Sequence, residues 1–228
     1  IDVELRQGET LGIVGESGSG KTTLGMALLR MQDSTGRIRF RDHIISDYRE
    51  QQMRPLRRFF QIVFQDPFSS LSPRMTVEQI VGEGLKLHYP ELNKAQRDDR
   101  IVAILNEVGL DKGALWRYPH EFSGGQRQRI AVARTMVLEP DVILLDEPTS
   151  ALDVSVQKQV LSLLSDLQVK HKLSYLFISH DLRVVRAMSH RVIVMREGKI
   201  VEAGDVEQVF DHPQQAYTRE LARASIYH

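Results

Sequence analysis

The residues best suited to chemistry begin with a glycine-rich run, Gly15-Glu16-Ser17-Gly18-Ser19-Gly20-Lys21-Thr22, with Thr23 directly after it. This run matches the phosphate-binding pattern G-x-x-x-x-G-K-[ST] in full. Such glycines let successive backbone N–H groups point at phosphate oxygens, and a helix that starts in the loop adds its positive end. Lys21 would then reach the β- and γ-phosphates of a nucleotide, and the Thr22 hydroxyl would bind Mg²⁺. The alternative is a flexible glycine turn, against which the strand-like run before it and the helical run after it both argue.

A pair of acids, Asp146 and Glu147, follows the apolar run 142–145. Two carboxylates at the end of a buried strand cost stability unless a cation or water balances them. Asp146 would belong to the Mg²⁺ shell, and Glu147 would act as the general base that polarises an attacking water. Taken alone, the pair is more typical of solvated acids at an ordinary strand end. Beside a phosphate-binding loop, the catalytic interpretation is preferred.

A third motif is Ser123-Gly124-Gly125-Gln126. Ser followed three residues later by Gln forms a capping box, so the motif can be an ordinary helix start. The two adjacent glycines go beyond what capping needs, because they expose backbone N–H groups at a helix N-terminus. The motif therefore also fits a second anion-binding site, and its residues alone leave both interpretations open.

Four apolar runs with the length of buried strands each end in a polar group. They are 11–14, 62–64, 142–145 and 176–178, which lead into the glycine-rich loop, Gln65, Asp146-Glu147 and Ser179-His180. In an open parallel sheet, ligands bind beyond the carboxyl ends of the strands. If these four runs are parallel neighbours, their polar groups converge on one edge.

The remaining pattern alternates strands with helices. Strands are expected at 1–5, 10–14, 36–40, 59–64, 142–145 and 173–178, a hairpin at 191–195 and 199–203, and helices at 20–31, 126–138 and 156–171. Apolar residues at helical spacing between 76 and 122 predict an inserted helical subdomain. We therefore expect one α/β domain with a P-loop NTPase core at about 1–75 and 123–228, a mostly parallel sheet and an antiparallel β portion.

Composition excludes several classes of function. Lys plus Arg and Asp plus Glu both number 30, so no net charge attracts nucleic acid or anionic lipid. The chain has no cysteine, which excludes disulfides, zinc–thiolate sites and iron–sulfur clusters. No apolar run approaches the roughly 20 residues that span a bilayer.

The sequence begins at Ile1 rather than Met, so we expect it to be part of a longer polypeptide. The single tryptophan, Trp116, is expected to pack within the helical subdomain.

The ordered set of motifs resembles the ABC transporter ATPases over essentially the whole chain. It comprises the loop with Lys21, Gln65, Ser123 to Gln126, Asp146-Glu147, Ser150-Ala151-Leu152-Asp153 and His180. The resemblance implies MgATP as ligand and a nucleotide-sandwich dimer, in which Ser123 to Gln126 of one domain cap ATP on the loop of the other. By the same resemblance, Gln65 would contact Mg²⁺ and relay to a membrane subunit, Asp153 would be the D-loop residue, and His180 would contact the γ-phosphate.

A narrower resemblance involves two further segments. Residues 64–74 are similar to the Q-loop of the oligopeptide, dipeptide and nickel importer group, and 212–219 to an altered His-Pro-Tyr-Thr tail of that group. The chain is most similar to the second ATPase half of Yej-type importers of peptides and microcin C. The implied partners are a second ABC ATPase half, permease subunits and indirectly a substrate-binding protein, without nucleic acid. The implied location is peripheral, on the cytoplasmic face of the inner membrane.

The chain departs from the pattern of this family at two points, and several other classes of nucleotide-binding protein are compared with it. The signature begins with Phe122 where the family more often has Leu, and the aromatic residue expected to stack on adenine would lie upstream of Ile1. A P-loop GTPase should carry Asn-Lys-x-Asp, which 93–96 lacks, and the insert is too short for a coiled-coil ABC ATPase. A regulatory half would lack Glu147 or His180, and both are present. A translation-factor ABC protein is the main alternative, which ribosome co-sedimentation would distinguish.

Overall fold

The computed structural model describes residues 1–66 and 70–224. Within them, six strands form one sheet in the order β4-β5-β6-β1-β7-β8. Their bounds are β1 (Thr10–Val14), β4 (Phe60–Val63), β5 (Val142–Asp146), β6 (Ser174–Ile178), β7 (Arg191–Arg196) and β8 (Lys199–Asp205). All neighbours pair in parallel except β7 and β8, which pair antiparallel. The predicted α/β fold with a mostly parallel sheet and an antiparallel portion is confirmed.

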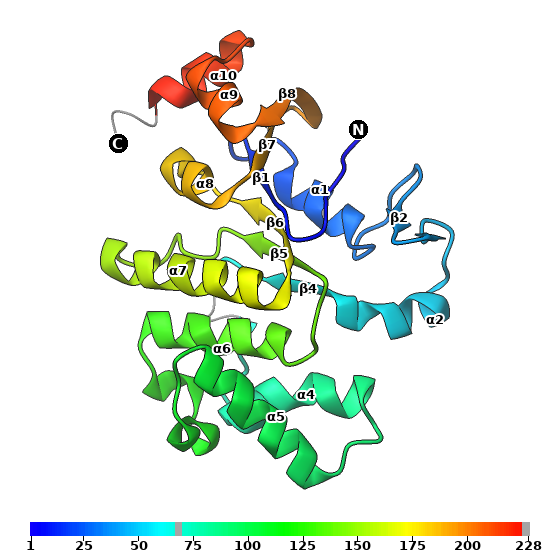
Figure 1. Ribbon diagram of the computed structural model, residues 1–228, viewed down its shortest axis with the longest axis vertical. Helices are drawn as coiled ribbons and strands as arrows, with labels where there is room; N and C mark the ends of the chain where they lie inside the picture. The colour runs from blue at the N-terminus through cyan, green and yellow to red at the C-terminus, as the bar shows by residue number, and fades with distance from the viewer. Residues whose placement is uncertain (67–69, 225–228) are drawn as a thin grey trace.

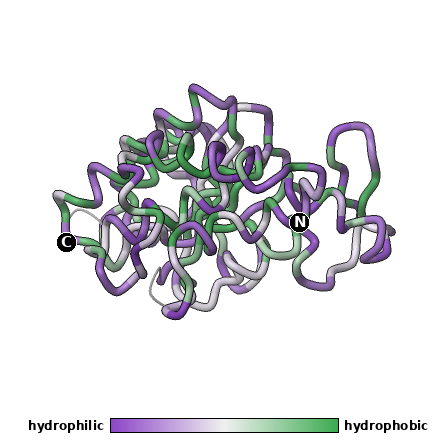
Figure 2. Tube along the Cα trace, turned by 90° about the horizontal axis from the view of Figure 1, so that it is seen from below, coloured by the Kyte–Doolittle hydropathy of each residue, from purple (hydrophilic) through white to green (hydrophobic). Residues whose placement is uncertain are grey.

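Helices cover both faces of the sheet (Figure 1). They include α1 (Lys21–Leu28), α6 (Gly124–Met136), α7 (Val154–His171), α8 (Leu182–Met188), α9 (Val206–Asp211) and α10 (Ala216–Ala224). Side chains alternate between two core clusters: Tyr175 and Phe177 belong to one, Leu176 and Ile178 to the other. Because both faces are buried, these strands are continuous apolar runs rather than alternating ones. Figure 2 shows the hydrophobic segments gathered in the interior of the trace.

A helical region occupies the end of the molecule below β4 in Figure 1. It contains α4 (Val77–His88), α5 (Lys94–Glu107) and the 3-10 helices η2 (Lys112–Trp116) and η3 (Pro119–Glu121), and it packs on α6. Thr76 and Asn93 begin α4 and α5 with capping boxes. Buried apolar side chains at helical spacing, such as Val77, Val81 and Leu85, form the inner face of α4. Sequence periodicity therefore places helices here correctly.

Three expectations for individual segments are wrong. Residues 1–6 carry no regular secondary structure, although Val3 and Leu5 still pack against the core. Alternating burial needs only an extended chain, not a hydrogen-bonded neighbour. The strand expected at 36–40 is limited to β2 (Arg39–Phe40), which pairs with β3 (His43–Ile44) in a separate sheet. Trp116 is 64% exposed instead of packed, because it ends η2 at the surface.

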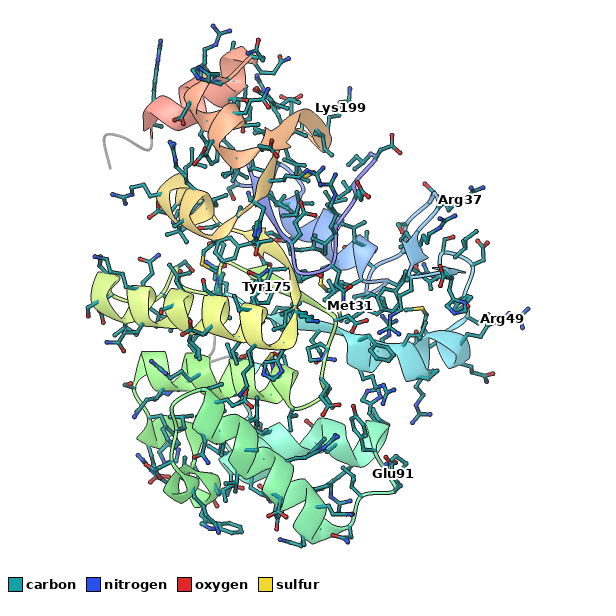
Figure 3. All side chains as sticks on the ribbon, in the orientation of Figure 1. Met31, Arg37, Arg49, Glu91, Tyr175 and Lys199 are labelled. Atoms are coloured by element: carbon teal, nitrogen blue, oxygen red, sulfur yellow. The ribbon has the colours of Figure 1, made fainter. Side chains whose placement is uncertain are left out.

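Two short helical elements connect the separate β2–β3 sheet to the main sheet. They are α2 (Glu50–Met53) and η1 (Arg54–Phe59), which lead into β4. Figure 3 places Tyr175 in the middle of the molecule and Arg37, Arg49 and Lys199 at its periphery. Of the described helices, none is both long and apolar enough to cross a membrane.

Candidate active site

The four strands that lead into polar groups are adjacent and parallel. The sheet order β4-β5-β6-β1 places their carboxyl ends along one edge, as expected from the sequence. At that edge Gln65 follows β4, Glu147 follows β5, His180 follows β6 and the glycine-rich loop follows β1. Ligands of open parallel sheets bind at this kind of edge.

The glycine-rich loop has a backbone that side chains would obstruct. Gly15 has a φ of 150°, and a Cβ there would lie 2.2 Å from the carbonyl oxygen of Met195 on β7. Gly20 has a φ of 99° and occupies the N-cap position of α1. A positive φ is accessible at low cost only to glycine. The loop can therefore turn tightly against β7 and then present the N-terminus of α1.

Lys21 lies inside this loop. Its Nζ donates hydrogen bonds to the carbonyl oxygens of Gly15 (2.9 Å) and Glu16 (2.8 Å), and the residue is 8% exposed. Burial lowers the pKa of Lys21, whereas the charges of Glu147 and Asp146 act in the opposite direction. The loop thus holds one ammonium group beside two carboxylates, where it can neutralise a phosphate.

Thr22 and Asp146 meet although they are 124 residues apart. The Thr22 hydroxyl donates to Oδ2 of Asp146 at 3.0 Å. Burial raises the pKa of Asp146, opposed by the Thr22 hydrogen bond and reinforced by the charge of Glu147. A hydroxyl and a carboxylate are the hard oxygen donors that Mg²⁺ prefers, so the residues present fit this ion.

The protein ligands for a metal are few. Among 1–66 and 70–224, no group of three or more His, Asp or Glu residues could hold a metal ion. Mg²⁺ is usually bound through one or two carboxylates together with phosphate oxygens rather than by a protein cage. The arrangement therefore suits an ion that arrives with a nucleotide. Gln65 is exposed after the adjacent strand β4.

Glu147 has an unusual backbone and a defined partner. Its φ is 48°, a left-handed backbone conformation that residues other than glycine seldom adopt. Its N–H donates to the carbonyl of Ile178, and its Oε2 lies 3.2 Å from Nδ1 of His180. Strained backbone persists where surrounding contacts over-determine it. These contacts hold the carboxylate beside His180, and its charge acts on the ammonium of Lys21.

Ser123 begins α6 with the predicted capping box. The Gln126 N–H donates to the Ser123 Oγ at 3.3 Å, and the Gln126 Oε1 accepts from the Ser123 N–H. The adjacent glycines differ: a Cβ on Gly125 would lie 2.3 Å from Val156 on α7, whereas on Gly124 it would make an ordinary 3.4 Å contact. Close packing of α6 on α7 thus accounts for Gly125, and Gly124 is left without such a reason.

The Ser123 motif lies away from the glycine-rich loop. Helix α6 packs on α4, α5, α7 and β4, while the loop follows β1, three strands away in the sheet. At about 4.8 Å per strand, β4 and β1 are roughly 14 Å apart. In Figure 1, α6 and α1 lie on opposite sides of β5 and β6. Ser123 therefore belongs to the α4–α5 side of the sheet, whereas Lys21 belongs to the loop after β1.

Asp153 has a local partner. Its side chain caps α7 by accepting hydrogen bonds from the N–H groups of Ser155 and Val156. The Val156 hydrogen bond is the main cause of a lowered pKa at Asp153.

Sequence reasoning missed Tyr217, whose hydroxyl accepts a hydrogen bond from the Glu16 N–H in the glycine-rich loop. Only the tail motif at 212–219 pointed to that region.

Comparison with known proteins agrees with this geometry. The family model described as "ABC transporter" matches residues 1–150. The peptidoglycan transport ATP-binding protein YejF of Agrobacterium fabrum is 60% identical over 99% of this chain and 41% of its own length. The dipeptide transport ATP-binding protein DppF of Lactococcus lactis is 48% identical over 97% of this chain and 72% of its own length.

The solved structures include a similar fold. The dimeric post-hydrolysis structure of the ATP-binding cassette MJ0796, bound to ADP and Pi, matches with a TM-score of 0.79 and 27% identity. The match covers 90% of this chain and 88% of that one. The chain spans about two fifths of the length of the Agrobacterium relative.

Proposed function

The chain belongs to the ABC transporter family of ATP-binding domains, and we propose that it binds and hydrolyses MgATP to energise an importer of peptides or peptide-like compounds. The observation that carries this proposal is the convergence of Lys21, Thr22, Asp146, Glu147 and His180 on one edge of the sheet. ATP hydrolysis needs a phosphate cradle, a metal site and a base, and this edge has residues for all three.

Each residue has a part in the reaction. The N–H groups of residues 15–23 and the Lys21 ammonium bind the phosphates. Thr22, Asp146 and Gln65 would hold Mg²⁺, which would neutralise charge on the phosphate oxygens. Glu147 takes a proton from the attacking water, and His180 orients that carboxylate through its 3.2 Å contact. Charge stabilisation and positioning supply most of the catalysis.

A second copy of the fold completes the site. Because α6, which Ser123 begins, packs on β4 and the loop follows β1, three strands away, we infer that Ser123 to Gln126 cap ATP on a partner domain. Asp153, at the start of α7, would lie near the same interface. The dimeric state of the similar cassette with ADP and Pi supports this arrangement. The partner is a second ABC ATPase half, on the same or on another polypeptide.

The cargo follows from relatives. Proteins named for dipeptide and peptidoglycan transport match nearly all of this chain, which supports peptides or peptide-like compounds as the cargo rather than a ribosomal function.

We infer that residues 76–122 form a helical subdomain that contacts permease subunits. The domain would then work at the cytoplasmic face of the inner membrane, and a substrate-binding protein would act indirectly. Part of the Q-loop resemblance, 67–69, lies outside the described residues.

Two measurements test the proposal. MgATP hydrolysis is expected from the chain paired with its partner half, and ATP-dependent peptide uptake from vesicles that carry the permease. Absence of nucleotide binding would refute the ATPase assignment. Co-sedimentation with ribosomes instead of permease subunits would favour the translation-factor alternative.

A further inference from the structure

The C-terminal tail contacts the phosphate-binding loop directly. The backbone N–H of Glu16 donates a hydrogen bond to the hydroxyl oxygen of Tyr217 at 3.0 Å, across 201 residues of sequence. Tyr217 lies on α10 and is 7% exposed. A buried hydroxyl aimed at one loop amide is a specific contact that core packing alone does not require.

Two groups of the β7–β8 hairpin hold Tyr217 and the segment just before it. The guanidinium of Arg196, at the end of β7, lies 5.0 Å from the centre of its ring. The carboxylate of Glu202 on β8 accepts hydrogen bonds from the N–H groups of Gln214 and Gln215, just before α10. The tail is therefore fixed on the β7–β8 hairpin before it reaches the loop.

The same hairpin contacts the loop at a second point. The N–H of Gly198, in the β7–β8 turn, donates to the carbonyl of Ser19 at 2.9 Å. Gly15, at the start of the loop, lies against the backbone of Met195. The hairpin thus contacts the loop at Gly15 and at Ser19, and Tyr217 adds a hydrogen bond at Glu16 between them.

Glu16 connects the tail to the lysine. Its N–H is bonded to Tyr217, and its carbonyl accepts the hydrogen bond from Lys21 Nζ at 2.8 Å. A rotation of the peptide on either side of Glu16 would move the Lys21 acceptors or the N–H groups that follow in the loop. Fixing this residue keeps the loop close to one arrangement, which lowers the ordering cost of ligand binding.

We propose that Tyr217 is a positioning residue for nucleotide binding, which acts by holding the Glu16 peptide of the phosphate-binding loop. This inference rests on the proposed function, because the loop must bind a nucleotide for its order to affect affinity. It also assigns the tail a role within the ATPase site. Displacement of α10 by a partner would then weaken nucleotide binding.

The test uses a pair of matched tyrosine variants. Tyr217→Phe removes only the hydroxyl and keeps the ring under Arg196. Tyr89→Phe is the control: Tyr89 is 9% exposed, its hydroxyl donates to the Leu138 carbonyl at 3.1 Å, and the guanidinium of Arg100 lies 4.5 Å from its ring centre. Both variants lose one tyrosine hydrogen bond beside a guanidinium, but only Tyr217→Phe loses a contact to the phosphate-binding loop.

Two readouts are measured on the wild-type chain and on both variants. Hydrogen exchange of the Glu16 amide, followed by NMR without nucleotide, is expected to accelerate in Tyr217→Phe alone. The Kd for a fluorescent ATP analogue with Mg²⁺ should rise about two- to tenfold in the same variant, the range of one net hydrogen bond. With the partner half present, KM should rise similarly and kcat should change little.

The outcomes separate the two proposals. If no chain binds nucleotide, the proposed function fails, and with it the role in affinity, while Glu16 exchange still reports whether the contact forms. If the wild type binds and Tyr217→Phe binds equally well, the positioning role is wrong. Equal weakening by Tyr89→Phe would likewise overturn it, since the effect would then follow general stability.

Discussion

Nδ1 of His180 lies 3.2 Å from Oε2 of Glu147, and the two residues follow neighbouring parallel strands, β6 and β5. The Glu147 side chain is largely buried, and that of His180 is largely exposed. The histidine therefore contacts the carboxylate from the solvent side. A base held on one side by a hydrogen bond keeps its orientation while water approaches from another.

Glu147→Gln should separate binding from hydrolysis. Glutamine is nearly isosteric but cannot accept a proton from water, so kcat should fall about 10²–10⁴-fold while ATP stays bound. Sedimentation velocity with MgATP and the partner half should then detect a stable dimer. Glu197→Gln is the control, because Glu197 shares the left-handed backbone (φ 50°) but has an exposed side chain. Parental turnover in Glu147→Gln would mean that another residue is the base.

Lys21→Ala should abolish ATP binding and hydrolysis. The ammonium is the cation that the loop places among its carbonyls, and no neutral side chain replaces its charge against phosphate. The fold should persist with some loss of stability, since the carbonyls of Gly15 and Glu16 lose their donor. Circular dichroism and a nucleotide titration measure both effects. Lys86→Ala, on the exposed side of α4, should change neither.

The adjacent glycines of the Ser123 motif should respond differently to alanine. Gly125→Ala should destabilise the domain by about 1–3 kcal/mol, because the new methyl group would overlap Val156. Gly124→Ala meets only an ordinary contact with Leu152 and should be neutral, or stabilising by up to about 1 kcal/mol. Urea unfolding of both variants decides the matter. Equal destabilisation by both would contradict the packing explanation.

The link between α5 and α7 should weaken in acid. Glu107 on α5 accepts from His171 (2.7 Å) and Lys170 (3.0 Å) on α7. Burial acts to raise the pKa of Glu107, but these hydrogen bonds outweigh it and hold the pKa below its usual 4.5. Because the folded-state pKa is the lower one, the link stabilises the fold above pH 4.5, and this contribution is lost as pH falls through the folded-state value.

Glu107→Gln tests this link by urea unfolding at two pH values. At pH 7 the variant should be less stable by about 0.2–1 kcal/mol, the range for exposed ion pairs. At pH 3 the difference should be smaller, because the Glu107 carboxylate loses its charge as pH falls through its folded-state pKa. Glu91→Gln, an exposed position, should show no difference at either pH. A loss that is larger at pH 3 than at pH 7 would contradict the sign of this argument.

The residues at the active-site edge of the sheet could be predicted because the pattern that reveals them lies within each strand. A strand buried on both faces is a continuous apolar run, and the residue after it lies at the sheet edge wherever the strand stands in the order. For this reason the placements of Gln65, Glu147 and His180 after their strands follow from the sequence. The contact of Thr22 with Asp146 then follows from sheet order.

Other features depend on long-range partners that no local pattern encodes. The bond from Glu16 to Tyr217 spans 201 residues, and the alternation at 1–5 looks like a strand because local sequence does not show whether a neighbouring strand exists. The two glycines of the Ser123 motif look alike in sequence, yet only Gly125 faces Val156. Burial of Trp116 was wrongly expected because helix composition does not reveal which end reaches the surface.

Trp116 is the single tryptophan of the chain and is exposed on η2. All indole fluorescence of residues 1–228 therefore originates from one water-facing position in the helical region. A blue shift of that emission would report that another molecule has covered η2, and nucleotide entering the glycine-rich loop has no second tryptophan through which to add a signal. The chain thus carries its own optical probe for one surface, which needs no label.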